Sequence, residues 1–294
     1  MKGKSIGLLF ALFAMLIVYF LINMPASTDS QSAAQTPVIT PEITLMIVLS
    51  SNDIDAEPTP APAPPELTAL PEPTASQEPT ARPIINPDVD PSRPMVALTF
   101  DDGPSMYTPD ILDILERNNC RATFCVIGNR LDTRKDMVRR AFDLGCEIFG
   151  HSWDHRNFTK IKAETIKQEL RDTTAAIDAI TGYSPMLYRP PLGAYDDKVM
   201  KASAELGYSL VNWSVDSRDW SRKDAKKVYN GIMHDVFDRS IILCHDLYGS
   251  TVEAMERVIP DLLAKGYQLV TVSELMYYSD ISLKPGKLYR SGIK

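Results

Sequence analysis

From about residue 94 onwards, short apolar runs alternate with longer segments in which apolar residues recur every three or four positions. Short apolar runs predict buried strands, and segments with the helical period predict amphipathic helices. The predicted strands cover residues 96–100, 122–127, 146–150, 186–188, 209–215, 241–244 and 268–272. The predicted helices between them cover residues 108–115, 135–144, 163–180, 196–206, 223–236 and 250–265.

Start and stop signals support these helix boundaries. Thr108 is a predicted N-cap because Pro109 follows it, and Ser250 with Glu253 predicts a capping box. Glycines follow four of the helices, as expected at helix ends. Six or seven strand–helix units predict an α/β fold with a parallel sheet, either closed as a barrel or open and doubly wound. A glycine-rich phosphate loop does not follow the first strand, so we do not expect a nucleotide-binding protein.

The N-terminal segment contains an unbroken apolar run at residues 6–22, preceded by Lys2 and Lys4. A run of 17 residues reaches the lower bound of about 17 for a membrane span, and it exceeds the roughly 7–15 of a cleaved signal. We therefore interpret residues 1–24 as a signal-anchor with the N-terminus inside the cell and the remainder outside. Secretion after signal cleavage is the alternative.

Residues 25–93 read as a disordered linker, because 15 of the 22 prolines lie between Pro25 and Pro94. Proline-rich chain stays semi-extended and cannot bury a core. Residues 1–94 carry 10 acidic and 4 basic side chains, which leaves 28 acidic and 27 basic ones for the folded part. A nearly neutral domain without a basic stripe is not expected to bind nucleic acid. We place the domain at residues 94–277 and a C-terminal tail at 278–294.

Two adjacent carboxylates, Asp101 and Asp102, follow the first predicted strand and precede a Gly-Pro turn. Ligands of parallel α/β domains bind at the carboxyl ends of the strands. An Asp-Asp-Gly sequence is also common in ordinary turns, so this pair alone does not establish a site.

The histidines strengthen the case for a site, because the chain has only 4 and two of them, His151 and His155, follow the third predicted strand. A spacing of four places both imidazoles on one face of a helical turn, where they could hold one metal ion with an aspartate from elsewhere. Three protein ligands leave a position open for water, as in catalytic sites. His234 lies on a polar helix and is expected to be exposed.

Three more strand ends carry polar residues, among them Arg189, Asp219 and His245. Arg189 stands next to two prolines, a rigid setting that suits a fixed ion pair with a carboxylate. Five polar clusters at five strand ends are hard to explain by structural needs alone. We therefore expect them to form one active site.

In this order, the five clusters resemble those of the polysaccharide deacetylase family, which has a NodB homology domain and forms carbohydrate esterase family 4. The resemblance extends from about Pro94 to Leu275. It implies a distorted (β/α) barrel with about seven repeats. It also implies a metal-dependent hydrolase that removes acetyl groups from N-acetylated sugars in polymers.

The resemblance assigns roles to residues of this sequence. Asp101 would be the catalytic base, tethered by Arg189, and His245 the general acid, oriented by Asp219. The metal ligands would be Asp102, His151 and His155. The expected metal is Zn²⁺, although Co²⁺ and Ni²⁺ accept the same ligands.

The resemblance also implies substrate-binding positions. Trp220 and Leu243 would line a small pocket for the acetyl methyl group, and the backbone N–H of Leu192, between Pro191 and Gly193, would help to hold the oxyanion. The family usually has an aromatic residue where Leu192 stands, so a ring that would flank the sugar is missing here.

The 4 cysteines permit two disulfides, but most lie in apolar strands and a core of this size needs no covalent staples. We expect a monomer with free thiols. The expected localisation makes N-acetylglucosamine of peptidoglycan the first candidate substrate. The alternatives are chitin oligomers, another poly-N-acetylglucosamine or acetylated xylan. A non-catalytic carbohydrate-binding protein is the alternative of another class, although a pure binder has no need of an acid, a base and a metal together.

Overall fold

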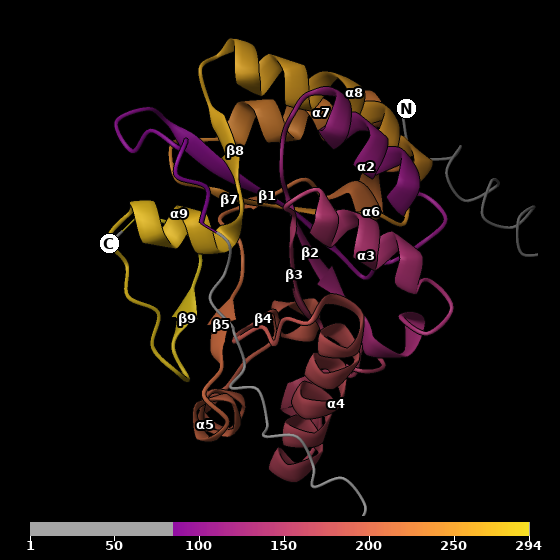
Figure 1. The fold of residues 1–294 in the computed structure, drawn as a ribbon, viewed down its shortest axis with the longest axis vertical. Coiled ribbons are helices and arrows are strands. Elements are labelled where there is room, and N and C mark those ends of the chain that lie inside the picture. The colour runs from indigo at the N-terminus through magenta and orange to yellow at the C-terminus, as the bar shows by residue number, and fades with distance from the viewer. Residues whose placement is uncertain (1–84, 294) are drawn as a thin grey trace, which may run out of the picture. The chain divides into compact units, whose positions relative to one another are not determined.

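The computed structural model describes residues 85–293. Its strands form one curved parallel sheet in the order β6-β7-β1-β2-β3-β4-β5-β9, with β8 also paired to β1 (Figure 1). This result confirms the predicted α/β class. The strands are β1 (Met95–Asp101), β2 (Thr123–Val126), β3 (Glu147–Gly150), β4 (Leu187–Tyr188), β5 (Ser209–Val211), β6 (Val215–Asp216), β7 (Ile241–His245), β8 (Gln268–Val270) and β9 (Leu288–Tyr289).

Helices connect the strands, and most of them follow one another around the outside of the sheet, with α9 apart from this row (Figure 1). The helices are α2 (Thr108–Arg117), α3 (Lys135–Asp143), α4 (Ala163–Thr181), α5 (Asp197–Glu205), α6 (Asp219–Arg222), α7 (Ala225–Asp235), α8 (Gly249–Ala264) and α9 (Val272–Tyr278). Three short 3₁₀ turns are η1 (Gly128–Arg130), η2 (Phe158–Lys160) and η3 (Pro191–Gly193).

The fully buried strand β1 separates two hydrophobic clusters, because successive side chains of a strand point to opposite faces. Its residues Val96, Leu98 and Phe100 join the outer cluster, which includes the buried faces of α2, α3, α7 and α8. Met95 and Ala97 join the inner cluster, which α9 completes. The sheet is therefore covered by helices outside and filled by side chains inside.

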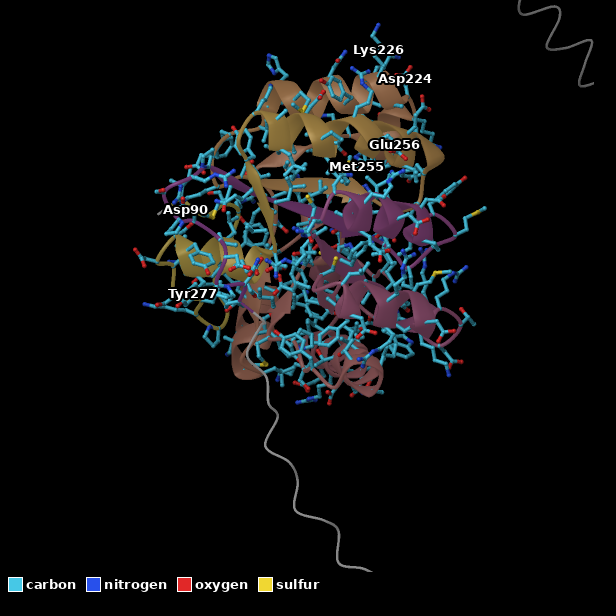
Figure 2. All side chains as sticks on the ribbon, turned by 45° about the horizontal axis from the view of Figure 1, so that its top comes forward. Asp90, Asp224, Lys226, Met255, Glu256 and Tyr277 are labelled. Atoms are coloured by element: carbon cyan, nitrogen blue, oxygen red, sulfur yellow. The ribbon has the colours of Figure 1, made fainter. Side chains whose placement is uncertain are left out.

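Helix α8 shows how the outer layer is built. Met255 is fully buried in the outer cluster, whereas its neighbour Glu256 is exposed and pairs with Arg117 of α2 at 2.7 Å (Figure 2). The helical period turns one side of α8 to the core and leaves charges on the other side.

The predicted strand at 209–215 is two strands, β5 and β6, at different places in the sheet. β5 pairs with β4 and β9, whereas β6 pairs with β7 near the other end of the strand order. Only residues 212–214 join them, a stretch that spans at most about 14 Å. The sheet must therefore curl until its two ends approach each other, which rules out the open, doubly wound alternative and agrees with a distorted, incompletely closed barrel.

Two predicted helix starts are wrong by a small margin. α2 begins with Tyr107 as its N-cap, one residue before the predicted cap at Thr108. Helix α8 begins at Gly249 after Tyr248, with no side-chain cap, so the Ser250–Glu253 capping box does not form. Ser250 already lies inside the helix, where its hydroxyl cannot serve as the cap.

The chain beyond Val270 differs from the prediction in another way. The last predicted strand stops there because Thr271 and Glu274 form a capping box that starts α9. The residues predicted as a tail include β9, which pairs in parallel with β5. Tyr289 of β9 is buried in the inner cluster, so this segment is part of the folded unit.

All 4 cysteines are buried free thiols. The predicted signal-anchor and most of the proline-rich linker lie outside the described residues. Among residues 85–293, none of the helices combines the length and the apolar composition that a bilayer-spanning helix requires.

Candidate active site

The alternation of side chains along the strands brings the predicted site residues together. Ala97 of β1 points into the inner cluster, so Asp101, four positions on, lies on the same face at the carboxyl end of the strand. At three other strand ends, a site residue also lies an even number of positions after a residue of the inner cluster and so faces the same side. The pairs are Phe149 and His151, Leu187 and Arg189, and Ile241 and His245.

Asp101 forms a buried ion pair with Arg189. Arg189 Nη1 donates to Asp101 Oδ1 at 2.7 Å, and both side chains are almost completely shielded from solvent. The guanidinium also donates to Thr99 Oγ1 at 2.7 Å and to the carbonyl oxygens of Val211 and Asn212 at 3.3 Å. Burial disfavours its charge, but the charge of Asp101 outweighs burial and raises the pKa of Arg189.

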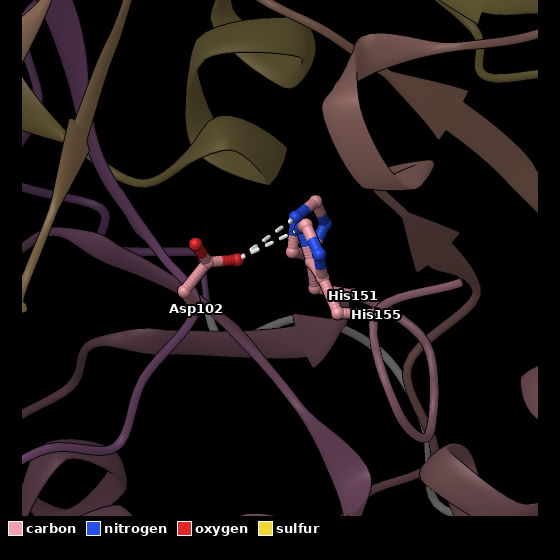
Figure 3. A group of neighbouring side chains, drawn as sticks. All are labelled: Asp102, His151 and His155. Carbon is pink, nitrogen blue, oxygen red and sulfur yellow. Dashed lines mark ion pairs between the residues drawn. The ribbon is translucent and has the colours of Figure 1, made fainter. Parts of the chain in front are cut away.

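Asp102, His151 and His155 form a candidate metal site (Figure 3). Asp102 Oδ1 lies 3.4 Å from His151 Nε2 and 3.2 Å from His155 Nε2, and one donor atom from each residue fits within 4.8 Å of the others. Asp102 Oδ1 is buried without a hydrogen-bond partner among residues 85–293. A buried carboxylate oxygen beside two imidazole nitrogens is a donor set that suits Zn²⁺.

The protonation states also suit metal binding. His151 Nδ1 lies 2.7 Å from the carbonyl oxygen of Arg189, which can only accept, so Nδ1 carries the proton and Nε2 presents a lone pair to the site. Burial and then the neighbouring His151 lower the pKa of His155. Burial opposes ionisation of Asp102, but the adjacent His151 and His155 side chains lower its pKa to about 2.

The segment from His151 to His155 is not the helical turn that the spacing suggested. It is a loop in which Ser152 and His155 have positive φ angles of 83° and 63°. The His155 N–H donates to Ser152 Oγ at 2.7 Å inside this loop. The two imidazole rings still approach each other, with ring centroids 5.2 Å apart, so the expected pairing of the histidines arises from a different backbone.

His245 and Asp219 form a second polar pair at the end of β7. His245 Nδ1 lies 2.7 Å from Asp219 Oδ1, and the His245 N–H donates to Asp219 Oδ2 at 2.7 Å. Thr251 Oγ1 donates to the same Oδ2 at 2.8 Å, and Asp219 is fully buried. Burial opposes the charged imidazole, but the hydrogen bond and charge of Asp219 raise the pKa of His245 to about 9.

Asp101, the three candidate metal ligands and His245 line a cleft of about 350 Å³, whereas their partners Arg189 and Asp219 are fully buried and do not line it. Leu192 and Trp220 are 66% and 53% exposed at the cleft, whereas Leu243 is buried in its wall. Gly193 also lines the cleft, but Pro191 is buried and does not. The complete lining is Asp101, Asp102, His151, His155, Leu192, Gly193, Trp213, Asp216, Trp220, Leu243, His245 and Tyr248.

Three lining residues, Trp213, Asp216 and Tyr248, were not among the predicted site residues. The first two belong to the same strand-end cluster as Asp219 and could have been included on that basis. Tyr248 follows His245 by three residues and meets it edge-on, with ring centroids 6.2 Å apart. Tyr248 lies between the end of β7 and the start of α8, and this position at a strand end could have indicated a site residue.

Comparison with known proteins assigns this chain to a family. A sequence profile described as Polysaccharide deacetylase matches residues 88–211. A peptidoglycan-N-acetylglucosamine deacetylase of Bacillus cereus (strain ATCC 14579) is 34% identical over 197 residues, which cover 65% of this chain and 92% of the relative. The chain belongs to the polysaccharide deacetylase family.

Two further relatives extend the comparison. The peptidoglycan-N-acetylglucosamine deacetylase PgdA of Listeria monocytogenes serotype 1/2a (strain 10403S) is 36% identical over 195 residues, which are 66% of this chain and 41% of PgdA. This chain therefore matches about two fifths of that relative's length. The solved structure of the peptidoglycan deacetylase PdaC from Bacillus subtilis superimposes with a TM-score of 0.63 at 35% identity, covering 65% of this chain and 94% of PdaC.

Proposed function

We propose that this protein is a metal-dependent deacetylase that removes N-acetyl groups from N-acetylglucosamine residues of peptidoglycan. One observation carries the proposal: a carboxylate paired with a buried arginine and an imidazole paired with a buried carboxylate line the same cleft as a two-histidine, one-aspartate metal site. The bacterial relatives described above are peptidoglycan deacetylases, which supports this substrate class.

Asp102, His151 and His155 would hold the metal. When bound there, Zn²⁺ would polarise the acetyl carbonyl and make a water acidic enough to lose its proton near neutral pH. The protein contributes the arrangement of the donors. The backbone carbonyl of Arg189 fixes the tautomer of His151, and the low pKa of Asp102 keeps this carboxylate ionised at all pH values at which the enzyme would work.

Asp101 would accept the proton of the attacking water. Its Oδ2 lies 3.8 Å from His151 Nε2, so the carboxylate borders the metal site, while Arg189 holds the other oxygen. A fixed base in a buried setting has no freedom to turn away from the substrate, which favours proton transfer. The same ion pair keeps Asp101 ready to accept the proton without a search for the right rotamer.

His245 would donate a proton to the leaving amine, because an amine leaves an acyl group readily only when it is protonated. The Asp219 carboxylate accepts the hydrogen bond from His245 Nδ1, which directs Nε2 away from Asp219. A pKa of about 9 keeps the imidazole charged at neutral pH, as a general acid requires.

The substrate would lie across the cleft. The turn at Pro191–Gly193 uses the N–H groups of Gly193 and Ala194 for its own hydrogen bonds, to Pro190 and Pro191. The Leu192 N–H has no backbone acceptor within residues 85–293, and it is the group that we assign to the oxyanion. Trp220 and Leu243 offer apolar surface to the acetyl methyl group.

We also propose that the domain acts outside the cell, next to the membrane. The apolar run at residues 6–22 with its flanking lysines and the proline-rich stretch that follows support an anchor and a spacer. A tethered domain of this kind would meet peptidoglycan before other acetylated polymers.

Acetate release tests the proposed activity. The purified full-length protein is loaded with Zn²⁺ and incubated with N-acetylglucosamine oligomers, peptidoglycan and acetylated xylan, with His151→Ala and Asp102→Ala in parallel. We expect release from the N-acetylated substrates and at least a ~100-fold loss in both variants. Release from acetylated xylan alone would show that the substrate carries acetyl esters and not N-acetyl amides. Failure of a folded, zinc-loaded protein to release acetate from any substrate would refute the activity.

A further inference from the structure

We propose that Glu169 of α4 is a positioning residue for the metal ligands: it holds the loop from Ser152 to His155 in the shape that brings His155 to the same ion as His151. The inference rests on the metal site of the proposed function. Glu169 is only 6% exposed and does not line the cleft, so it would act through the loop rather than on the substrate.

Glu169 holds the loop by two hydrogen bonds to its backbone. The N–H groups of Trp153 and Asp154 donate to Glu169 Oε2 at 2.7 and 3.3 Å. The other two N–H groups of the loop donate to side chains as well, that of Ser152 to Tyr188 Oη at 2.6 Å and that of His155 to Ser152 Oγ at 2.7 Å. One carboxylate oxygen therefore accepts from half of the backbone N–H groups of the loop.

The loop needs this support because its backbone is strained. Ser152 and His155 both have left-handed φ angles, which cost about 1–3 kcal/mol for a residue other than glycine. No regular strand or helix includes the loop. Its carbonyls at Ser152 and Trp153 accept from Gly128 and Asn129 at 2.9 Å, so the loop is held from both sides.

The two histidines depend on the loop to different degrees. His151 directly follows β3, its N–H donates to Val126 at 2.8 Å, and its ring is held by the carbonyl of Arg189. His155 has no such anchor on the sheet, and its ring position follows from the loop conformation. Loss of the Glu169 contacts should therefore displace His155 and weaken the metal site while the rest of the fold stays in place.

A carboxylate is not essential for this role, but an oxygen at the same distance is. Glu169→Gln keeps a carbonyl oxygen that can accept both N–H groups, whereas Glu169→Ala removes the acceptor and Glu169→Asp withdraws it by one methylene. The neighbouring exposed residue provides the matched control, Gln168→Ala, on the same helix. Arg156 lies 3.9 Å from Glu169 Oε1, so Arg156→Gln tests any contribution of the charge.

The experiment measures Zn²⁺ dissociation constants of the full-length variants by chelator competition, with circular dichroism to confirm folding. We expect Glu169→Ala to bind Zn²⁺ about 10–100-fold more weakly, the range seen for groups that orient metal ligands, and Glu169→Asp to lose affinity in the same direction. Glu169→Gln, Arg156→Gln and Gln168→Ala should stay within about threefold of the wild type. Excess Zn²⁺ should restore acetate release by Glu169→Ala.

Wild-type zinc affinity in folded Glu169→Ala and Glu169→Asp would overturn the role of Glu169. Equal losses in Glu169→Gln and Glu169→Ala would overturn it too, because the oxygen acceptor would then be irrelevant. A wild-type protein that binds Zn²⁺ no better than Asp102→Ala would instead refute the metal site, and the proposed function with it. If Glu169→Ala is unfolded, Glu169→Asp decides the question alone.

Discussion

The two neighbouring aspartates at the end of β1 have different environments although they are chemically identical. Asp101 is still in the strand and points inward to Arg189. Asp102 has left the strand with a φ of 70°, a left-handed conformation that aspartate tolerates better than most residues, and it faces the two histidines. One turn of the backbone thus separates the proposed base from a proposed metal ligand.

Asparagine at each of these positions should separate the two roles. Asp101→Asn is expected to keep Zn²⁺ bound but to release acetate about 10²–10⁴-fold more slowly, the usual contribution of a general base. Asp102→Asn should lower zinc affinity by more than the ~100-fold that is typical when a residue that only hydrogen-bonds to a metal ligand is removed. Zinc titration and acetate release on both variants check this. Loss of metal in Asp101→Asn with retention in Asp102→Asn would contradict the assignment.

The pairing of His245 with Asp219 predicts a pH effect. The carboxylate raises the pKa of the imidazole to about 9, against the effect of burial, so removal of its charge must lower that pKa. A general acid works only below its pKa, and the alkaline limb of the kcat/KM profile of Asp219→Asn should therefore move to lower pH. Activity should fall more at pH 9 than at pH 6.

The pH profile of zinc-loaded Asp219→Asn, measured by acetate release, tests this shift. Asp216→Asn is the matched control, since Asp216 precedes Asp219 by three residues and lines the cleft, but accepts a hydrogen bond from the Arg218 N–H rather than from His245. Its alkaline limb should stay in place. An unshifted limb in Asp219→Asn would remove His245 as the proton donor.

At the scale of single elements, the sequence predicted what depends on local periodicity. Leu187 is an inner-cluster residue and Arg189 lies two positions on, so strand alternation alone turns Arg189 inward. The spacing of four between His151 and His155 fits a helix equally well, but the hydrogen bonds from this segment to Glu169 and Tyr188 select a loop instead. Those partners lie 15 to 36 residues away, beyond any local pattern.

The C-terminal strand β9 escaped prediction for a similar reason. It has two residues and gains its stability from pairing with β5. The predicted run at 209–215 also hid the break after Val211, because an apolar sequence does not reveal that the Asn212 N–H donates to Tyr289 at 2.8 Å while the Ser214 N–H donates to Ile241 at 3.0 Å. The residue before Trp213 thus pairs with β9 and the residue after it pairs with β7, so the apolar run belongs to two strands.

Strand β9 should therefore matter for stability and for the cleft. Tyr289 is 8% exposed in the inner cluster, and replacement of a buried aromatic residue by alanine costs about 3–5 kcal/mol. The Asn212 N–H donates to the backbone carbonyl of Tyr289, and Asn212 Nδ2 donates to the carbonyl of Gly193 at 3.0 Å. A shift of β9 that follows loss of the buried ring should therefore also raise the KM for oligomers. Urea unfolding and kinetics of Tyr289→Ala measure both effects.

The exposed residue Ile293 supplies the control for this element. Ile293→Ala, at 58% exposure, should change the unfolding free energy by less than about 0.5 kcal/mol. Equal stability of Tyr289→Ala and Ile293→Ala would show that the segment after α9 is dispensable, as a tail would be.

At the scale of the whole domain, one buried guanidinium connects the active site to the closure of the sheet. Arg189 follows β4 and reaches across the interior to Asp101 of β1, and it also donates to the carbonyls of Val211 and Asn212. These carbonyls stand where the curled sheet breaks between β5 and β6. Arg189 therefore hydrogen-bonds to backbone acceptors at the break while it neutralises the carboxylate.

Arg189→Met should accordingly destabilise the whole domain by about 3–5 kcal/mol, the usual result when one partner of a buried ion pair is removed. Arg139 offers the contrast, because it pairs with Asp143 at the same 2.7 Å but with its side chain 52% exposed. Screening by solvent limits such a pair to about 1 kcal/mol, so Arg139→Met should be nearly neutral. Urea unfolding of both variants measures how much burial changes the contribution of an ion pair to stability when the N–O distance is the same.

A double-mutant cycle shows whether the loss comes from the stranded charge of Asp101 or from the unsatisfied carbonyls. Asp101→Asn removes that charge, so the double variant Asp101→Asn, Arg189→Met should be more stable than the sum of the single losses predicts. Strict additivity would mean that the carbonyls at the break account for the effect. In either case the His151 ring keeps its bond to the Arg189 backbone, and zinc affinity should survive in the fraction that folds.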